Sequence, residues 1–406
     1  MKRLLLALPL TFSINAQAEV PLEKIQVFAE VFERIRASYV DEISDEQLLD
    51  SAIRGMLDDL DPHSSYLPPT DFQDMREDTQ GAFGGLGIEV ARDNGLIRVV
   101  TPIDGSPAAG AGIKPGDLIF KIDGTDIRGL PLNEAIEMLR GPVESEVVIE
   151  VMRAGDELEF SLIRDLITVN SVRGQFIEPG FAWLRISQFQ DDTGRETLDV
   201  LRELNDEQAL RGIVLDLRNN PGGVLGAAVG VVNAFVDDGV VVSTQPRDQD
   251  QGVEFRAAAS DFNFDDTPLV VLINEGSASA SEIVAGAIQD MQRGIIMGTT
   301  SFGKGSVQTL LPLPDSSALK LTTALYYTPS GRSIQNNGIT PDIKVEQGTF
   351  DASENLFAFR ERDLNKRLDN PTDALVEEEE STNALLDDDF QLSEALNMLK
   401  GLSILR

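Results

Sequence analysis

The sequence predicts an α/β fold built on a mostly parallel sheet, with a smaller domain inserted into it and a helical arm at its N-terminus. Three observations lead to this prediction. Patterns typical of strands buried on both faces occur at residues 212–218, which open with four apolar residues, and at 269–273, which are apolar throughout, and a helical pattern follows each. A glycine-rich segment at 81–165 carries strand and helix signals of its own. Residues 21–75 repeat apolar side chains at the three- and four-residue spacing of helices.

The composition excludes several classes of function. The 406 residues allow two to four domains, and 68 acidic against 34 basic residues argue against nucleic acid or an anionic membrane as a partner. The absence of cysteine excludes disulfides and a cysteine nucleophile, and the only histidine is His63. We expect no metal and no cofactor.

The N-terminus has the pattern of a secretory signal peptide. Two basic residues, Lys2 and Arg3, precede an apolar segment at 4–12, and Ala-Gln-Ala at 16–18 supplies a small-residue cleavage site. The apolar segment is too short to span a bilayer, and no later run is long enough. We therefore expect residues 1–18 to be removed and the mature chain to lie in the periplasm without a transmembrane segment.

A helical region is predicted at residues 19–80. Ser44 and Gln47 have the spacing of a capping box at the start of its second helix, and Asp-Pro at 61–62 ends that helix. His63 follows, and as the only histidine it is a candidate for catalysis, although a linker into the next domain is the interpretation we favour. Apolar faces exposed on such paired helices would also allow self-association.

A stretch of alternating serines follows the buried strand at 269–273. Gly276 ends the strand pattern, Ser277, Ser279 and Ser281 follow, and helical spacing then continues to residue 290. A strand that turns through small residues into a helix presents a hydroxyl beside free backbone N–H groups, which suits a nucleophile and the oxyanion that it creates. The same pattern also fits a simple helix cap, in which a serine only accepts an N–H bond.

A serine nucleophile in this chain has few possible activators. With one histidine and no cysteine, lysine is the remaining base, and Lys304 lies between two glycines. Lowering a lysine pKa from ~10.4 to ~7.5 requires roughly 4 kcal/mol of desolvation. An ordinary surface lysine is one alternative. A phosphate-binding loop from Gly298 to Lys304 is another, but Gly305 stands where that loop needs Ser or Thr, and a strand pattern follows.

Two motifs carry a resemblance to a known family. Asn-Glu-Gly-Ser-Ala-Ser-Ala-Ser-Glu at 274–282 and Phe-Gly-Lys-Gly-Ser-Val-Gln at 302–308 resemble those of the carboxyl-terminal processing (tail-specific) peptidases. The resemblance implies a crotonase/ClpP-like peptidase core and a Ser–Lys mechanism. It implies the following roles: Ser279 as nucleophile, Lys304 as general base, Gln308 as the residue that orients the lysine, and Asp290 as a supporting residue.

The segment at 81–165 resembles a PDZ domain of the circularly permuted type found in bacterial periplasmic proteases. Its glycine-rich opening suits carboxylate capture, because backbone N–H groups there can converge on a peptide terminus that pairs with the following strand. The residues concerned are Gly85, Leu86, Gly87 and Ile88. Arg140, just after the predicted helix that begins at Leu132, is a candidate regulatory contact with the core, and a plain surface arginine is the alternative.

The predicted peptidase core spans residues 166–347. Asn-Asn-Pro-Gly-Gly at 219–223 follows a buried strand and is the second hallmark of the same family resemblance. Glycines there would present free N–H groups, so Gly222 or Gly223, together with Ala280, is expected to bind the oxyanion. The remaining residues, 348–406, are predicted to hold a solvated acidic segment and a terminal amphipathic helix that docks on the body or on another subunit.

The sequence as a whole predicts a secreted serine endopeptidase that selects proteins partly by their C-termini. Its expected partners are protein or peptide substrates with accessible C-termini, with an adaptor protein or a homo-oligomer as further possibilities. Two alternatives belong to other classes: a catalytically silent PDZ scaffold, and a hydrolase of small esters or amides on the same core. An intact dyad argues against the first, and the PDZ domain against the second.

Overall fold

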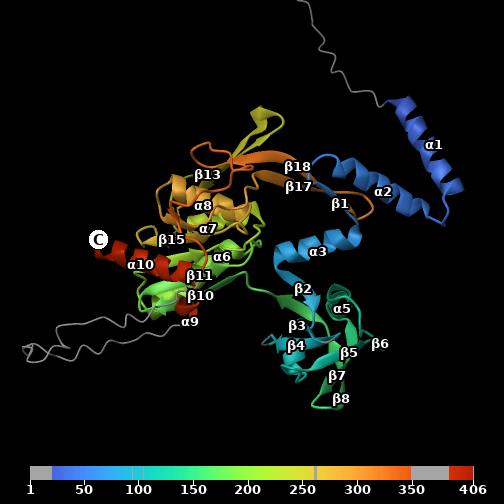
Figure 1. The fold of residues 1–406 in the computed structure, drawn as a ribbon, viewed down its shortest axis with the longest axis horizontal. Coiled ribbons are helices and arrows are strands. Elements are labelled where there is room, and N and C mark those ends of the chain that lie inside the picture. Colours follow the sequence, from blue (N-terminus) through green and yellow to red (C-terminus); the bar gives the residue numbers. More distant parts are fainter. Residues whose placement is uncertain (1–20, 94, 104, 260–262, 349–383, 406) are drawn as a thin grey trace, which may run out of the picture. The chain divides into compact units, whose positions relative to one another are not determined.

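The computed structural model describes residues 21–348 and 384–405, apart from residues 94, 104 and 260–262 (Figure 1). The predicted signal peptide and most of the predicted acidic segment lie outside the described residues. The chain divides into two compact units, residues 1–66 and 67–406. No helix in the described ranges is long and apolar enough to cross a membrane.

The first unit contains two helices, α1 (Leu22–Ser38) and α2 (Asp45–Asp58). The expected capping box starts α2: the Gln47 N–H donates to Ser44 Oγ at 3.1 Å, and the Gln47 side chain accepts the Ser44 N–H at 3.2 Å. His63 lies in a turn in which Asp61 accepts its N–H at 2.8 Å.

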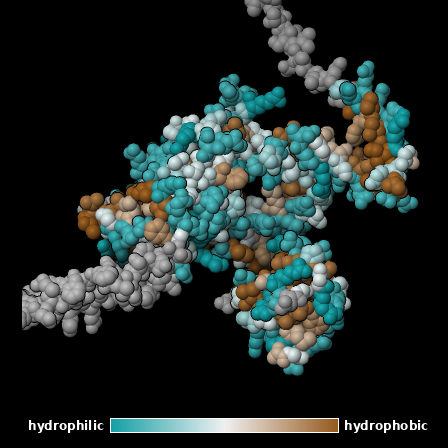
Figure 2. Space-filling model, in the orientation of Figure 1, coloured by the Kyte–Doolittle hydropathy of each residue, from teal (hydrophilic) through white to brown (hydrophobic). Residues whose placement is uncertain are grey.

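Helix α1 buries none of its side chains and carries an apolar stripe, which is brown in Figure 2. The exposed apolar residues on α1 are Leu22, Ile25, Val27, Phe28, Val31 and Ile35.

The second unit opens with α3 (Pro69–Gln80), which leads into a small α+β body. The chain enters this body at β2 (Ala82–Gly85) and leaves it at β9 (Asp165–Thr168), and these two strands pair with each other. The sheet of the body has the order β3-β4-β5-β7-β8, with β6 paired to β5. Its elements are β3 (Ile88–Asp93), β4 (Leu96–Pro102), α4 (Pro107–Gly110), β5 (Leu118–Ile122), β6 (Thr125–Asp126), α5 (Leu132–Leu139), β7 (Glu146–Arg153) and β8 (Asp156–Ile163). One separate apolar cluster fills it, as expected of an inserted domain.

A six-stranded sheet forms the centre of the larger body, in the order β10-β11-β12-β15-β16-β19. Its strands are β10 (Val172–Glu178), β11 (Phe181–Ile186), β12 (Gly212–Asp216), β15 (Leu269–Ile273), β16 (Ile295–Gly298) and β19 (Ile343–Lys344). All neighbours from β11 onward are parallel, and only β10 is antiparallel to β11. Every residue of β12 and β15 is buried, as their sequence patterns predict.

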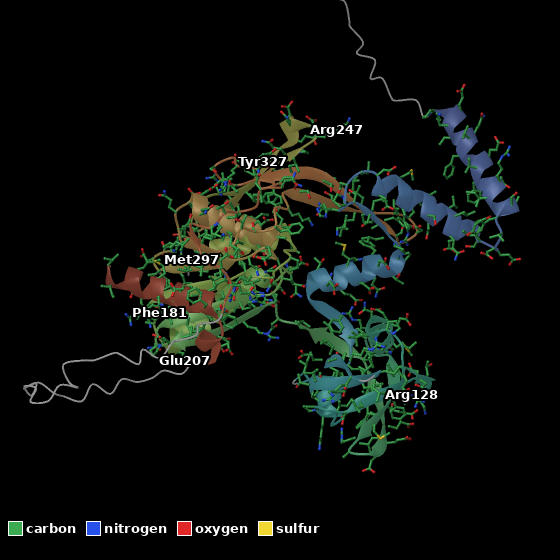
Figure 3. The ribbon with its side chains drawn as sticks, viewed as in Figure 1. Arg128, Phe181, Glu207, Arg247, Met297 and Tyr327 are labelled. Atoms are coloured by element: carbon green, nitrogen blue, oxygen red, sulfur yellow. The ribbon has the colours of Figure 1, made fainter. Side chains whose placement is uncertain are left out.

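Helices cover both faces of this sheet (Figure 1). One face packs against α6 (Thr193–Glu207), α7 (Leu225–Asn233) and α8 (Ala280–Asp290), and the other against α10 (Phe390–Ile404), which follows the short α9 (Ala384–Asp387). Phe181 and Met297, labelled in Figure 3, belong to the cluster beneath α10. Helix α10 contributes Leu392, Ala395, Leu396 and Leu399 to that cluster. Since burying a leucine contributes roughly 1.5–3 kcal/mol, this helix is firmly docked on the body.

A second sheet lies beside the first in the same unit. Its strands are β13 (Gly239–Pro246), β14 (Val253–Ala257), β17 (Ser306–Pro312) and β18 (Ala318–Tyr327), with a 3-10 turn η1 (Gln249–Gln251) between the first two. Strand β18 pairs with β17 and with β13, and β13 pairs with β14. The strand pattern after Gly305 predicts β17, whereas the β13–β14 hairpin was not anticipated. Strand β17 begins two residues after Lys304, so this sheet supports the lysine loop.

Candidate active site

The candidate site lies at the edge of the central sheet where its parallel strands end. Strands β12, β15 and β16 are neighbours and point the same way, so the turns that follow them meet at one edge. These turns comprise residues 217–223, 274–279 and 299–305. A cavity of about 530 Å³ opens at this edge. The site residues predicted from the sequence that line it are Gly222, Gly223, Ser279, Lys304 and Gln308.

Ser279 has a strained backbone, with φ 55° and ψ −111°. A positive φ at a residue other than glycine costs on the order of 1–3 kcal/mol and persists only where the surroundings enforce it. Here the turn is held between a fully buried strand, β15, and a helix, α8, whose residues are buried from Ala280 to Ile288. Packing therefore fixes the serine at the start of α8 and on the wall of the cavity.

The two neighbouring serines face the protein interior. The Ser277 hydroxyl donates to the Leu217 carbonyl oxygen at 2.8 Å, and the Ser281 hydroxyl donates to the Asn220 carbonyl oxygen at 3.0 Å. Both side chains are fully buried. Of the three alternating serines, Ser279 is the one that lines the cavity.

Glu282 joins the serine turn to the lysine loop. Its buried carboxylate accepts four hydrogen bonds: from the N–H groups of Ser279 at 2.8 Å, Gly303 at 2.7 Å and Lys304 at 2.9 Å, and from the Ser301 hydroxyl at 2.6 Å. Burial raises the pKa of the Glu282 carboxyl above its ordinary value, while these donors oppose the rise. One side chain thus sets the distance between the two segments that carry Ser279 and Lys304.

Tyr326 holds the lysine loop from the neighbouring strand β18. Its phenol donates to the Lys304 carbonyl oxygen, and its N–H donates to the Gly305 carbonyl oxygen at 2.9 Å. Burial raises the pKa of the Tyr326 phenol well above its ordinary value, the negative charge of Glu282 adds to the rise, and a hydrogen bond with the Ser279 side chain opposes it. The phenol therefore stays protonated and lies beside both the serine hydroxyl and the lysine backbone.

The glycine turn after β12 is anchored to the turn after β15. Asn219, with φ 53°, donates its N–H to Asn274 Oδ1 at 2.8 Å and accepts from Asn274 Nδ2 at 2.9 Å. The Asn220 carbonyl oxygen accepts the Ala278 N–H at 3.0 Å. These bonds hold the two turns in register directly beside the nucleophile candidate.

Two backbone N–H groups are available next to Ser279. Among the described residues, the N–H groups of Gly223 and Ala280 form no hydrogen bond, whereas that of Gly222 donates to Asn220 Oδ1 at 2.9 Å. A Cβ atom added to Gly222 would lie 2.7 Å from Ser279 Cβ and 2.9 Å from the Ala280 nitrogen, and the φ of Gly222 is +99°. Only glycine permits this approach.

Gln308 lines the cavity from β17. Its Nε2 donates to Ser306 Oγ at 3.0 Å and to Thr322 Oγ1 at 3.3 Å, which fixes the orientation of the amide.

Asp290 lies at the opposite end of α8 from Ser279, about 16 Å away along eleven helical residues. It accepts the Ser330 N–H at 3.0 Å and pairs with Arg332 at 3.2 Å. Burial alone would raise its pKa, but hydrogen bonds from Thr328 and Ser330, together with Arg332, hold the pKa of Asp290 below its usual range. Asp290 thus stabilises the turn after β18 and does not line the cavity.

The four residues predicted to capture a carboxylate line a separate cavity of about 220 Å³ in the smaller body, with Arg140 on its wall. Among the described residues, the N–H groups of Leu86 and Gly87 form no hydrogen bond, while their carbonyl oxygens accept from Ala108 and Ile103. Gly87 has φ +70°, and a Cβ there would lie 2.3 Å from Ser106 Cβ.

Arg140 stacks on Phe83, with the guanidinium 4.4 Å from the ring centroid, and its Nε atom is buried without a hydrogen-bond partner among the described residues. Both residues also line a second cavity, of about 190 Å³, whose lining includes Ser187, Gln188 and Gln190 of the larger body.

Family models match three parts of the chain. The model of peptidase family S41 matches residues 180–345, a PDZ-domain model matches residues 98–153, and a model of the activating protease CtpB N-terminal domain matches residues 11–70. A carboxy-terminal-processing protease of Bartonella bacilliformis is 50% identical over 325 residues, which cover 79% of this chain and 74% of the relative. The chain belongs to peptidase family S41.

Other members of family S41 are similar over the same extent. The carboxy-terminal processing protease CtpA of Bacillus subtilis is 35% identical over 325 residues, covering 80% of this chain and 69% of the relative. A carboxyl-terminal-processing protease of Synechocystis is 38% identical over 313 residues, which cover 75% of this chain and 72% of the relative. The predictions of an α/β serine-type peptidase and of a PDZ domain are confirmed.

Sequence reasoning missed two residues of this site. Glu282 lies three residues after Ser279, at the spacing of a helix cap, and this spacing gave no sign of the lysine loop 19 to 22 positions away. Tyr326 gave no functional signal, because it lies in a strand of mixed apolar and polar residues and most buried hydroxyls only satisfy local hydrogen bonds.

Proposed function

We propose that this chain is a periplasmic endopeptidase that selects proteins partly by their C-termini and cleaves them through a Ser279–Lys304 dyad. The observation that carries the proposal is the cavity at the carboxyl edge of the central sheet, which is lined by a strained serine, a lysine and a glycine turn. Relatives named carboxy-terminal processing proteases support the choice of substrate.

In the proposed first step, Ser279 Oγ attacks the scissile carbonyl carbon, and neutral Lys304 Nζ takes the hydroxyl proton. The carbonyl oxygen becomes an oxyanion that accepts hydrogen bonds from the Gly223 and Ala280 N–H groups, because both are unengaged beside the serine. The N–H of Gly222 already donates to Asn220 Oδ1, so Gly222 contributes by letting the turn lie close to Ser279.

In the second step the C–N bond breaks and Lys304 returns the proton to the leaving amine. Water then attacks the acyl carbon while Lys304 takes a proton from it; the bond from that carbon to Ser279 Oγ breaks, Lys304 returns the proton to Oγ, and the new C-terminal carboxyl group leaves. Gln308 is proposed to orient the lysine, since its Nε2 is occupied by Ser306 and Thr322 and its Oε1 is an acceptor. Asp290 is proposed to act only through the turn that it stabilises.

The PDZ domain is proposed to receive the substrate C-terminus at residues 85–88 and to regulate the dyad. Arg140 supports this role because it lines both the peptide groove and the cavity toward Gln188 and Gln190, so a bound peptide can alter its contacts with the core. A bound peptide shifts a resting equilibrium only by its difference in affinity for the two states. If the domain only recruits, a chain lacking residues 81–165 would still cut at high substrate concentration.

Location and assembly complete the proposal. The signal-peptide pattern at 1–18 supports export to the periplasm. The apolar stripe of α1 supports association with a second copy or with an adaptor.

The deciding experiment incubates the full chain with unfolded envelope proteins and follows their fragments by mass spectrometry. Ser279→Ala should abolish cleavage, and Lys304→Arg should do the same because a guanidinium cannot accept the proton. Ser51→Ala, at an exposed position on α2, is the matched serine control and should cut normally. Binding of C-terminal peptides without any cleavage would favour the scaffold alternative, and turnover of small esters alone would favour the small-molecule hydrolase.

A further inference from the structure

The C-terminal helix contributes a charged group to the segment that carries the glycine turn. Helix α10 begins after Asp389, whose carboxylate caps it by accepting the Leu392 N–H at 3.0 Å. The same carboxylate accepts two hydrogen bonds from the Arg218 guanidinium, at 2.8 and 2.6 Å. Gln391 accepts another from Arg218 at 3.0 Å and donates to the Val345 carbonyl oxygen at 2.7 Å. Two residues of the C-terminal segment therefore hold one arginine of the core.

Arg218 reaches α10 because side chains alternate along the chain from β12 onward. Ile213 and Leu215 belong to the cluster beneath α6, α7 and α8. Val214 belongs to the cluster beneath α10, and Asp216 and Arg218 continue that side in steps of two. Strand β12 thus ends at Asp216, and Arg218 follows two residues later on the side that the C-terminal helix covers (Figure 1).

A second buried carboxylate shares the Arg218 guanidinium. Asp216 accepts from Arg218 at 2.7 and 2.9 Å, from Arg185 at 3.0 Å and from the Trp183 indole at 3.2 Å. Only 12% of the Arg218 side chain and 3% of the Asp216 side chain are exposed. Bidentate pairs of this kind, shielded from water, hold a planar guanidinium in one orientation.

Arg218 directly precedes the glycine turn. The next residue, Asn219, has φ 53° and is bonded to Asn274, and Gly223 follows four residues later. The turn has little freedom to absorb a displacement of Arg218, because its far side is bonded to the serine turn.

A helix cap alone explains the bond from Asp389 to Leu392, but it does not explain the bidentate pair with Arg218. We propose that Asp389 is a positioning residue for the peptidase reaction and acts through Arg218. The 219–223 turn is then placed correctly only when the C-terminal helix is docked. The inference rests on the proposed function, in which the Gly223 N–H binds the oxyanion.

The test uses the full chain with Asp389→Ser. Serine is a good helix cap but is too short to pair with Arg218, so α10 keeps its start while the link is lost. We expect kcat to fall on the order of 10-fold, with KM and the thermal melting temperature nearly unchanged. Asp389→Glu, which keeps the charge, should recover part of kcat, and Asp388→Ser, at the exposed neighbouring position, should behave as wild type.

A double-mutant cycle identifies the route of the effect. If Asp389 acts through Arg218, adding Asp389→Ser to Arg218→Ala should cause no further loss of kcat. A folded Asp389→Ser variant with wild-type kcat, or fully additive losses in the cycle, would overturn the inference. If the serine variant fails to fold, Asp389→Thr, which also caps helices and is also too short to pair with Arg218, gives the same comparison. Ser279→Ala in the same assay distinguishes a failure of this inference from a failure of the proposed function. Cleavage that survives Ser279→Ala would refute the proposed function itself.

Discussion

Two glycine turns of this chain present backbone N–H groups to a negatively charged oxygen, one in the PDZ domain and one in the peptidase core. Within the described part of the chain, the N–H groups of Leu86 and Gly87 in the PDZ turn form no hydrogen bond, and the groove there is proposed to hold a permanent carboxylate. The same is true of the Gly223 N–H in the core turn beside Ser279, where the proposed oxyanion exists only during the reaction.

The difference between these turns lies in when the charge is present. Hydrogen bonds to a substrate carboxylate stabilise the ground state and lower KM, whereas bonds to an oxyanion stabilise the transition state and raise kcat. The turn that is proposed to stabilise the transition state is also the more firmly held of the two. The side chains of Asn220 and Asn274 and the Ser281 hydroxyl hold the core turn, while the PDZ turn is bonded mainly to Ile103, Ser106 and Ala108.

The largest effect is expected from the core turn. Gly222→Ala would place a Cβ against Ser279 and Ala280 at a φ that alanine disfavours, so the turn must withdraw from the serine. We expect kcat to fall about 10³-fold, the scale of losing one oxyanion donor, with KM for a peptide substrate little changed. Steady-state kinetics with a melting curve checks this, and a folded variant with an unchanged kcat would exclude the turn from the site.

The next effect concerns the tyrosine that holds the lysine loop beside this turn. Tyr326→Phe removes the hydrogen bonds to the Lys304 carbonyl and to Ser279, and we expect kcat to fall about 10- to 100-fold, because buried hydrogen bonds to a reacting group are worth about 1.5–3 kcal/mol. Tyr327→Phe, one residue further and only partly buried, is the control. Equal kinetics for the two variants would remove Tyr326 from the site.

A smaller effect, on a different kinetic constant, is expected from the PDZ turn. Gly87→Ala would bring a Cβ to 2.3 Å from Ser106 Cβ and distort the carboxylate groove. We expect KM for a tail-bearing protein to rise about 10-fold, while kcat at saturation stays within about threefold if the domain only recruits. Calorimetry with a C-terminal peptide measures the binding loss directly. A fall in kcat at every concentration would instead show that the PDZ domain also aligns the dyad.

The smallest effect concerns stability of the PDZ body rather than its turn. The Asp117 side chain is 1% exposed and accepts hydrogen bonds from the Arg153 guanidinium and the Lys114 N–H. Burial alone would raise the pKa of Asp117, but these partners hold it below its usual range. A depressed folded pKa contributes stability above the unfolded value of ~3.9 and loses it as the pH falls through the folded pKa. Asp117→Asn should lower the free energy of unfolding of this body by about 1–3 kcal/mol at neutral pH, and by less below pH 4.

The control for Asp117 is an exposed ion pair in the same body. Arg128, labelled in Figure 3, holds the pKa of Asp126 at about 2, but water screens this pair. Asp126→Asn should therefore leave the melting curve nearly unchanged at every pH. Urea unfolding followed by hydrogen exchange reports on the PDZ body separately from the core. If Asp117→Asn and Asp126→Asn lowered the free energy of unfolding of this body equally, the burial argument would be contradicted.

The sequence by itself determined much of this protein because the signals concerned are local. The buried run at 269–273, the capping box at Ser44 and the helix after Leu132 depend on neighbours within a few residues, and the structure has each of them. The pairing of Ser279 with Lys304 as candidates also came from motifs, and the structure brings both to one cavity.

Only the tertiary structure decided how those candidates are arranged. It turned Ser277 and Ser281 inward, occupied the N–H of Gly222, and bonded Asp290 to Ser330 and Arg332 in the turn after β18. It also joined partners that lie far apart in the chain, Glu282 to the lysine loop and Arg218 to the C-terminal helix. Hydrogen bonds of this kind depend on distances of a few tenths of an ångström between separate elements, and periodicity along the sequence carries no information about such distances.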